Sequence, residues 1–221
     1  MISIFDNEIA FYGCSFTDRD SGFVDSDKMY PALLAKYFNQ TERNFAKNGC
    51  SNYRSFDLIS DTNFKNNSIV VIQLTELSRI RHYDKKLTDI MLSLSDDKCL
   101  LHVYNDDFLM HELTRHLNFI TKLCREKNIR LIIWSIASFH NHERNQQLNQ
   151  LLSVYPEYVH LDARTSEMAR DTTYRVDNGY DGEGKPVGFG HPGPLSHQRI
   201  ADNLITKYNQ LYNQNQLTTS Q

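Results

Sequence analysis

The sequence predicts an α/β protein, a three-layer sandwich in which helices cover both faces of a central parallel sheet of about five strands. One observation is the alternation of short apolar segments with longer segments whose apolar residues recur at helical spacing. A second is that the strand segments are short and apolar, which is typical of parallel sheets covered on both faces. The chain also has no internal repeat and no low-complexity linker. We therefore expect one domain over residues 1–213 and a polar tail at residues 214–221.

The expected elements alternate along the chain from strand to helix. The strands are expected at residues 8–14, 41–49, 68–75, 130–138 and 158–163. The helices are expected at residues 28–39, 51–64, 111–129, 143–155 and 194–213.

In the first half of the chain, turn residues and helical spacing define the elements. The first strand ends at Gly13 and the second closes on Asn48–Gly49. Pro31 lies in the first turn of the first helix, where proline is tolerated. The segment 68–75, SIVVIQLT, is the clearest strand, because it is β-branched and apolar and is bounded by Asn-rich polar residues.

The second half contains one irregular region and two strongly periodic helices. Residues 79–107 look like an insertion with some helix. The helix at 111–129 is amphipathic, and the closing helix has apolar residues at helical period. These apolar positions are Leu113, Leu117, Ile120 and Leu123, and then Leu195, Ile200, Leu204, Tyr208 and Leu211. His197, in the first turn of the closing helix, is expected on the surface.

Composition excludes several classes of function. The chain has 221 residues, 40% hydrophobic and 23% charged residues, and a net charge of −3, so it lacks the basic excess of proteins that bind nucleic acid or anionic membranes. No signal peptide is visible, and no apolar stretch approaches the roughly 18–20 residues of a transmembrane helix. We expect a cytoplasmic protein without a nucleic-acid or membrane partner, and a viral origin stays open.

Cysteine and histidine spacing does not predict a metal site. The four cysteines, Cys14, Cys50, Cys99 and Cys124, form no C-x-x-C pair and are expected to be free thiols. Cys14 and Cys50 follow glycines at the ends of adjacent strands, where they are expected to pack under a site or, alternatively, to form a redox-switchable disulfide. His111 and His116 are five residues apart, about 140° around a helix, so they do not form a zinc-protease motif. We expect no metal and no organic cofactor.

The residues that follow the strands suit nucleophilic catalysis. Ligands of open parallel sheets bind beyond the carboxyl ends of the strands, where Ser15, Gly49 and Thr75 are found. A serine is a weak nucleophile until a base takes its proton. His191 lies just before the last helix, whose positive dipole end disfavours imidazolium and so keeps the ring ready to act as a base. The backbone N–H of Gly49 is suited to an oxyanion hole.

These blocks resemble those of the SGNH (GDSL-like) hydrolase superfamily, as a divergent member. Gly13-Cys14-Ser15-Phe16-Thr17 is similar to the nucleophile block, and Asn48-Gly49-Cys50-Ser51-Asn52 is similar to the block whose glycine donates to the oxyanion. Gly190-His191-Pro192 and the residues up to His197 are similar to the last block. The resemblance spans residues 9 to about 205 and implies a flavodoxin-like fold. It also implies Ser15 as nucleophile and His191 as base.

Two positions depart from the family pattern. The third block usually reads Gly-x-Asn-Asp, whereas this chain has Gln73-Leu74-Thr75-Glu76-Leu77-Ser78-Arg79. There, Thr75 can donate a hydroxyl to the oxyanion, an ionised Glu76 cannot, and Arg79 is a compensating positive group. The triad acid normally stands three residues before the histidine, and that position is Gly188. The acid could instead come from Asp177, Asp181 or Glu183, or the protein could use a Ser–His dyad.

The resemblance implies a serine esterase that acts on a small-molecule or glycan ester, such as an acetylated carbohydrate. Two other readings stay open. One is a weakly active or inert SGNH-fold module that binds within a larger assembly, consistent with Gly188 and the unusual third block. The other is a nucleotide-binding flavodoxin-like domain, which residues 13–17 disfavour because they offer few donors for a phosphate. The oligomeric state is not predicted.

Overall fold

The architecture is seen in a computed structural model of the chain. It describes residues 8–21, 24–75, 77, 79–82, 88–91, 104–135, 142–161 and 193–213. The C-terminal tail predicted at 214–221 lies outside these residues.

A five-stranded sheet forms the centre of the fold, and all of its paired strands run parallel. In spatial order the strands are β2 (Thr41–Asn44), β1 (Glu8–Tyr12), β3 (Ile69–Leu74), β6 (Arg130–Ser135) and β7 (Tyr158–Val159). From β1 the chain first adds β2 on one side and then β3 on the other. This doubly wound order creates a topological switch point between β1 and β3. The predicted α/β fold with a parallel sheet of about five strands is confirmed.

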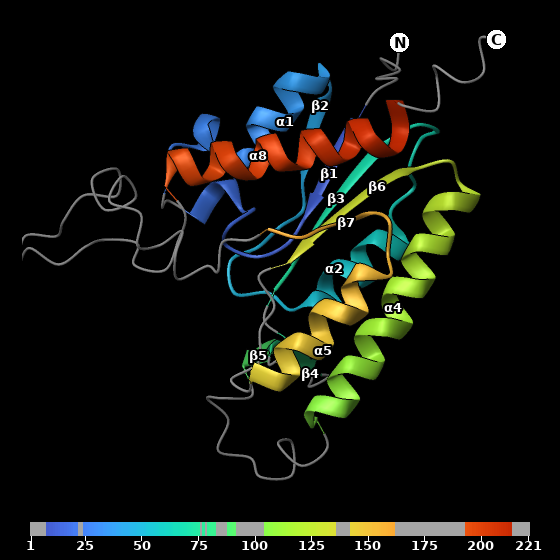
Figure 1. Cartoon of the computed structure of the whole chain (residues 1–221). Coiled ribbons are helices and arrows are strands. Elements are labelled where there is room, and N and C mark those ends of the chain that lie inside the picture. Colours follow the sequence, from blue (N-terminus) through green and yellow to red (C-terminus); the bar gives the residue numbers. More distant parts are fainter. Residues whose placement is uncertain are drawn as a thin grey trace, which may run out of the picture.

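Helices cover both faces of the sheet, as Figure 1 shows. One layer contains α1 (Tyr30–Phe38) and α8 (Pro194–Tyr208). The opposite layer contains α2 (Asn52–Asp61), α4 (Asp106–Glu126) and α5 (His142–Ser153). Short 3₁₀ turns lie at Arg19–Ser21 and Ser26–Lys28, and a π-helical turn, Asn209–Asn213, continues α8. The helices thus produce the expected three layers.

Strand β3 explains why the sheet needs a helical layer on each face. All six of its residues are buried. Because successive side chains of a strand point to opposite faces, Ile69 and Val71 pack in the α1/α8 layer while Val70 and Ile72 pack in the α2/α4/α5 layer. The two faces therefore form two separate apolar cores.

Side-chain caps start two of the helices. Asn105 accepts a hydrogen bond from the Phe108 N–H at 2.9 Å, and Ser51 accepts one from the Arg54 N–H at 3.4 Å. Such caps satisfy amides that have no partner within the helix. Because Asn105 provides the cap, α4 begins at Asp106 rather than at the predicted residue 111.

The insertion expected at 79–107 is described in part. It contains two antiparallel strands that were not predicted, β4 (Arg79–His82) and β5 (Thr88–Met91), and the start of α4, which agrees with the expectation of some helix. Both strands contain β-branched residues that favour extended backbone, and among the described strands each pairs with the other alone. Strand β2 is also shorter than predicted, because it ends at Asn44 before the turn that contains Gly49.

Candidate active site

Ser15 lies in a tight turn directly after β1, at the switch point of the sheet. We call residues 13–18 the Ser15 turn. The N–H groups of Thr17 and Asp18 both donate to the Cys14 carbonyl at 2.9 Å, which closes the turn. The Ser15 side chain is 5% exposed and its Oγ lies 4.0 Å from the Sγ of Cys14. The turn thus holds a hydroxyl at the carboxyl edge of a central strand.

The segment that carries Gly49 is bonded to the Ser15 turn. The Gly13 carbonyl accepts from the Lys47 N–H at 3.2 Å and from the Cys50 thiol at 2.8 Å. The Asn48 N–H donates to the Asp18 carboxylate at 2.7 Å. These bonds bring together the two blocks that the sequence predicted to meet.

Gly49 has the backbone geometry that favours glycine. Its φ is +76°, in the left-handed region, and a Cβ at this position would have nothing within 4 Å. Within the described part of the chain, its N–H donates to no acceptor. The Gly49 backbone is therefore open on the side where a side chain would stand.

Thr75 directly follows β3 and is held by Asn52, a residue to which the sequence analysis gave no role of its own. The Asn52 amide accepts from the Thr75 N–H at 2.8 Å and donates to the Thr75 carbonyl at 3.0 Å. This pair fixes the start of α2 to the end of β3. The Thr75 hydroxyl is buried and has no hydrogen-bond partner among the described residues. A buried hydroxyl without a partner costs free energy, so an acceptor supplied by a ligand would stabilise it.

His197 was predicted on the surface, and that prediction is wrong. It is 1% exposed, because its spacing from Ile200 and Leu204 places it on the buried face of α8. Its Nδ1 accepts from the Tyr30 N–H at 3.3 Å, and its ring stacks on the Tyr30 ring with 6.0 Å between centroids. Because a backbone N–H can only donate, Nδ1 carries no proton in this arrangement.

Several predicted site residues lie outside the described part. They are Glu76, Asp177, Asp181, Glu183, Gly188 and His191. Their roles stay predictions. Arg79 is described as the first residue of β4 and is partly buried. Helix α8 begins at Pro194, and His197 lies in its first turn.

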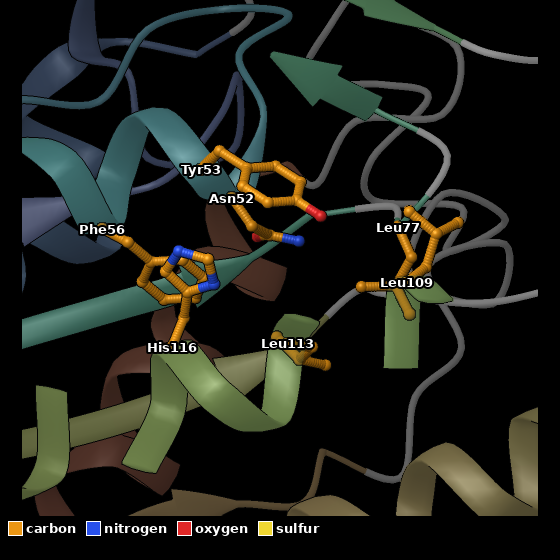
Figure 2. Close-up of a pocket in the computed structure, with 7 residues that line it drawn as sticks. All are labelled: Asn52, Tyr53, Phe56, Leu77, Leu109, Leu113 and His116. Atoms are coloured by element: carbon orange, nitrogen blue, oxygen red, sulfur yellow. The ribbon is translucent and has the colours of Figure 1, made fainter. Parts of the chain in front are cut away.

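A small pocket lies between α2 and α4, beside the end of β3 (Figure 2). Its lining residues are Asn52, Tyr53, Phe56, Leu77, Leu109, Leu113 and His116. The His116 ring stacks on Phe56 with 5.0 Å between centroids, and its Nδ1 donates to the Glu112 carbonyl at 2.8 Å. Burial raises the pKa of Tyr53 to about 12, so its hydroxyl stays protonated at neutral pH. Asn52 connects the pocket with the candidate site, because it lines the pocket and its amide also holds the Thr75 backbone.

The described residues also show the state of the cysteines and allow a search for metal sites and membrane spans. Cys14, Cys50 and Cys124 are buried free thiols, and Cys99 lies outside the described residues. In the described ranges, no group of three or more His, Cys, Asp or Glu is placed to hold a metal ion. None of the helices that the structure describes is both long and apolar enough to cross a membrane.

Comparison with known proteins identifies the fold. No protein-family model and no curated protein matches the sequence. The solved esterase EstA from Pseudoalteromonas sp., inhibited by monoethylphosphonate, matches with a TM-score of 0.53 at 12% identity, over 94% of this chain and 100% of that one. The acetyl xylan esterase Est2A from Butyrivibrio proteoclasticus matches with a TM-score of 0.50 at 12% identity, over 95% of this chain and 65% of that one.

A family two carbohydrate esterase from Clostridium thermocellum, an active-site mutant solved in complex with cellohexaose, has a TM-score of 0.51 at 14% identity. The match covers 94% of this chain and 64% of that one. These structures share the five-stranded parallel sheet and its flanking helices. Over most of its length, the chain therefore has the fold of the SGNH (GDSL-like) esterases.

Proposed function

We propose that this chain is a serine hydrolase that cleaves an ester, with Ser15 as nucleophile and His191 as general base. The observation that carries the proposal is the bonding of the Gly49 segment to the Ser15 turn at the switch point between β1 and β3. A nucleophile and a backbone donor for the oxyanion must stand at one place, and this arrangement brings their segments together. The SGNH fold supports the same reading.

In the proposed reaction, Ser15 Oγ attacks the ester carbonyl carbon while His191 takes its proton. The new bond makes a tetrahedral intermediate whose negative oxygen accepts from the backbone N–H groups of Ser15 and Gly49. Collapse breaks the bond to the leaving alcohol, which receives the proton from His191. Water, activated by the same base, then releases the acyl group and restores Ser15.

Thr75 is the proposed third oxyanion donor. Its buried hydroxyl has no partner in the described part of the chain, and Asn52 fixes its backbone on both sides of the residue. In this proposal the Thr75 hydroxyl donates to the bound oxyanion. Thr75 would then replace the asparagine that is usual in the third block.

The proposed substrate is a small acyl ester, such as an acetylated carbohydrate. Matches to an acetyl xylan esterase and to a carbohydrate esterase support this choice. We also propose that residues 1–213 act as a single domain and that Asp181 or a Ser–His dyad takes the place of the acid missing at Gly188. The competing proposal is an inert SGNH-fold binding module.

Hydrolysis of p-nitrophenyl acetate and p-nitrophenyl butyrate tests the proposal, with Ser15→Ala as the matched control. We expect the wild type to turn over the acetate ester and the variant to lose at least about 10³-fold in kcat/KM, as loss of a nucleophile does. Equal slow hydrolysis by both proteins, with equal thermal stability, would favour the binding module.

A further inference from the structure

We propose that Gln73 is a positioning residue that holds the Ser15 turn in its reactive geometry, an inference that rests on the proposed ester hydrolysis. Gln73 is the fifth residue of β3, is 0% exposed, and is the only polar residue in that strand. A buried amide carries a high desolvation cost unless its hydrogen bonds are satisfied. The contacts of this amide therefore show what it does in the sheet.

The Gln73 amide binds the Ser15 turn on both sides of the serine. Its Oε1 accepts from the Cys14 N–H at 3.1 Å and from the Thr17 hydroxyl at 2.6 Å, and its Nε2 donates to the Cys14 Sγ at 3.1 Å. Because a backbone N–H can only donate, the oxygen must face the turn, and the orientation of the amide is fixed. These bonds hold the residue before Ser15 and the second residue after it.

Gly13 makes room for this amide. A Cβ on Gly13 would lie 2.6 Å from the Gln73 Oε1, 2.6 Å from the Thr17 Oγ1 and 2.8 Å from the Gln73 Cβ. No real side chain tolerates such distances. The Gln73 side chain therefore occupies the place that a Gly13 side chain would take, which brings the turn directly against β3.

A chain of buried hydrogen bonds fixes the direction of the Thr17 hydroxyl. Trp134 Nε1 lies 3.3 Å from the Tyr30 hydroxyl and can only donate to it. The Tyr30 and Thr17 hydroxyls are 2.6 Å apart, and Thr17 uses its one proton on Gln73, so Tyr30 must donate to Thr17. Burial raises the pKa of Tyr30, which keeps this proton in place.

The same network reaches the start of α8. The Tyr30 N–H donates to His197 Nδ1 at 3.3 Å, and His197 lies in the first turn of the helix that begins at Pro194. The Thr17 carbonyl is also held, by the Asn44 side chain at 2.7 Å. The network thus fixes the position of the Ser15 turn relative to α8, the helix that follows His191 in the sequence. It joins Thr17 of the turn to residues of β3, β6, α1 and α8.

The test uses two isosteric variants, Gln73→Met and Thr17→Val, with Thr17→Ser as the variant that keeps the hydroxyl. Leu117→Ala, in the opposite layer, is the control for lost stability, because Leu117 belongs to the apolar core on the other face of the sheet, whereas Tyr30 and Trp134 belong to the α1/α8 core. Two quantities are measured on each folded protein. One is the rate of Ser15 labelling by an ethyl fluorophosphonate probe together with kcat and KM for p-nitrophenyl acetate. The other is amide hydrogen exchange of residues 14–18.

We expect Gln73→Met and Thr17→Val to lower the labelling rate and kcat by about 10- to 100-fold with little change in KM, the loss that a misplaced reacting group causes. Exchange of residues 14–18 should accelerate in both, Thr17→Ser should restore most of the rate, and Leu117→Ala should keep the wild-type rate per folded molecule. Wild-type rates in both isosteric variants, or losses equal to those of Leu117→Ala, would overturn the proposal.

The exchange measurement separates this inference from the proposed function. If Ser15 in the wild type does not react with the probe, ester hydrolysis fails as a function. Exchange then still decides whether Gln73 holds the turn: faster exchange at residues 14–18 in Gln73→Met supports it, and unchanged exchange overturns it.

Discussion

The two layers on either side of the sheet differ in how they contain polar side chains. The α1/α8 layer buries a connected polar network toward the carboxyl edge of the sheet, formed by Thr17, Tyr30, Gln73, Trp134 and His197. The α2/α4/α5 layer stays apolar to the same edge, where Leu74 and Leu77 are buried. Among its polar side chains, Asn52 binds the Thr75 backbone, Thr121 binds the Leu117 carbonyl, and the Tyr12 hydroxyl pairs with that of Thr62.

This difference separates stability from positioning. Apolar contacts are non-directional, so the α2/α4/α5 layer can stabilise the fold without fixing any one atom. Directed hydrogen bonds fix the orientation of the groups they join, and a fully satisfied buried network specifies one arrangement. We infer that the α2/α4/α5 layer mainly provides stability, while the α1/α8 layer also places Ser15.

The largest loss of stability should come from a substitution in the α2/α4/α5 layer. Leu117 is 0% exposed in the middle of α4, and Leu117→Ala should lower the free energy of unfolding by about 2–5 kcal/mol through lost transfer energy and a cavity. Urea denaturation measures this loss. A loss below about 1 kcal/mol would mean that this layer does not carry the stability assigned to it.

Gly13→Ala should lower the stability of the fold and also displace Ser15. The new Cβ would collide with the Gln73 side chain and the Thr17 hydroxyl, so β1 and β3 must shift apart, at a cost of about 1–3 kcal/mol. The shift moves the Ser15 turn, and the proposed esterase activity per folded molecule should fall as in Gln73→Met. A stable, fully active Gly13→Ala protein would contradict the close approach of the turn to β3.

Tyr30→Phe removes the central hydroxyl of the network and nothing else. The Trp134 N–H would lose its acceptor and Thr17 would lose its donor, at a cost of about 1–3 kcal/mol. Denaturation curves for the single and double variants with Thr17→Val measure the coupling. Additive losses would show that the two hydroxyls do not act as one network.

The smallest effect should come from the loss of an ion pair on α4, on the outer surface of the α2/α4/α5 layer. Arg115 hydrogen-bonds Glu112 at 2.7 and 3.0 Å and lowers the pKa of that carboxyl. A lowered pKa gives stability that is present at neutral pH and is lost as the pH falls through the pKa of the folded state. Arg115→Ala should therefore cost only about 0.3–0.5 kcal/mol at pH 7 and nothing in strong acid. An equal cost at both pH values would exclude the ion pair as its cause.

Local pattern was enough to predict the sheet and its helices. Apolar strands such as 68–75 and the periodic helix that contains Leu117 depend on neighbouring residues, and both are confirmed. Strands β4 and β5 were not predicted, because the apolar residues of 79–91 are too few to set a period and the two strands are stabilised by pairing with each other.

The site was predicted less completely, because its supporting residues meet only in three dimensions. Ser15 and Gly49 lie in the turns that follow the neighbouring strands β1 and β2, so topology alone predicted that their segments would meet. Gln73 gave one signal, a polar residue within an apolar strand, but its partner at Thr17 is 56 residues away in the chain. His197 could have been found from its helical spacing to Ile200 and Leu204.

The most direct test of the central claim is covalent labelling of the folded protein with an ethyl fluorophosphonate probe, followed by mass spectrometry of its peptides. If Ser15 is the nucleophile, the wild type should carry the adduct on Ser15, and the equally folded Ser15→Ala variant should carry none. A folded wild type that stays unlabelled, or an adduct that persists in Ser15→Ala, would contradict the account.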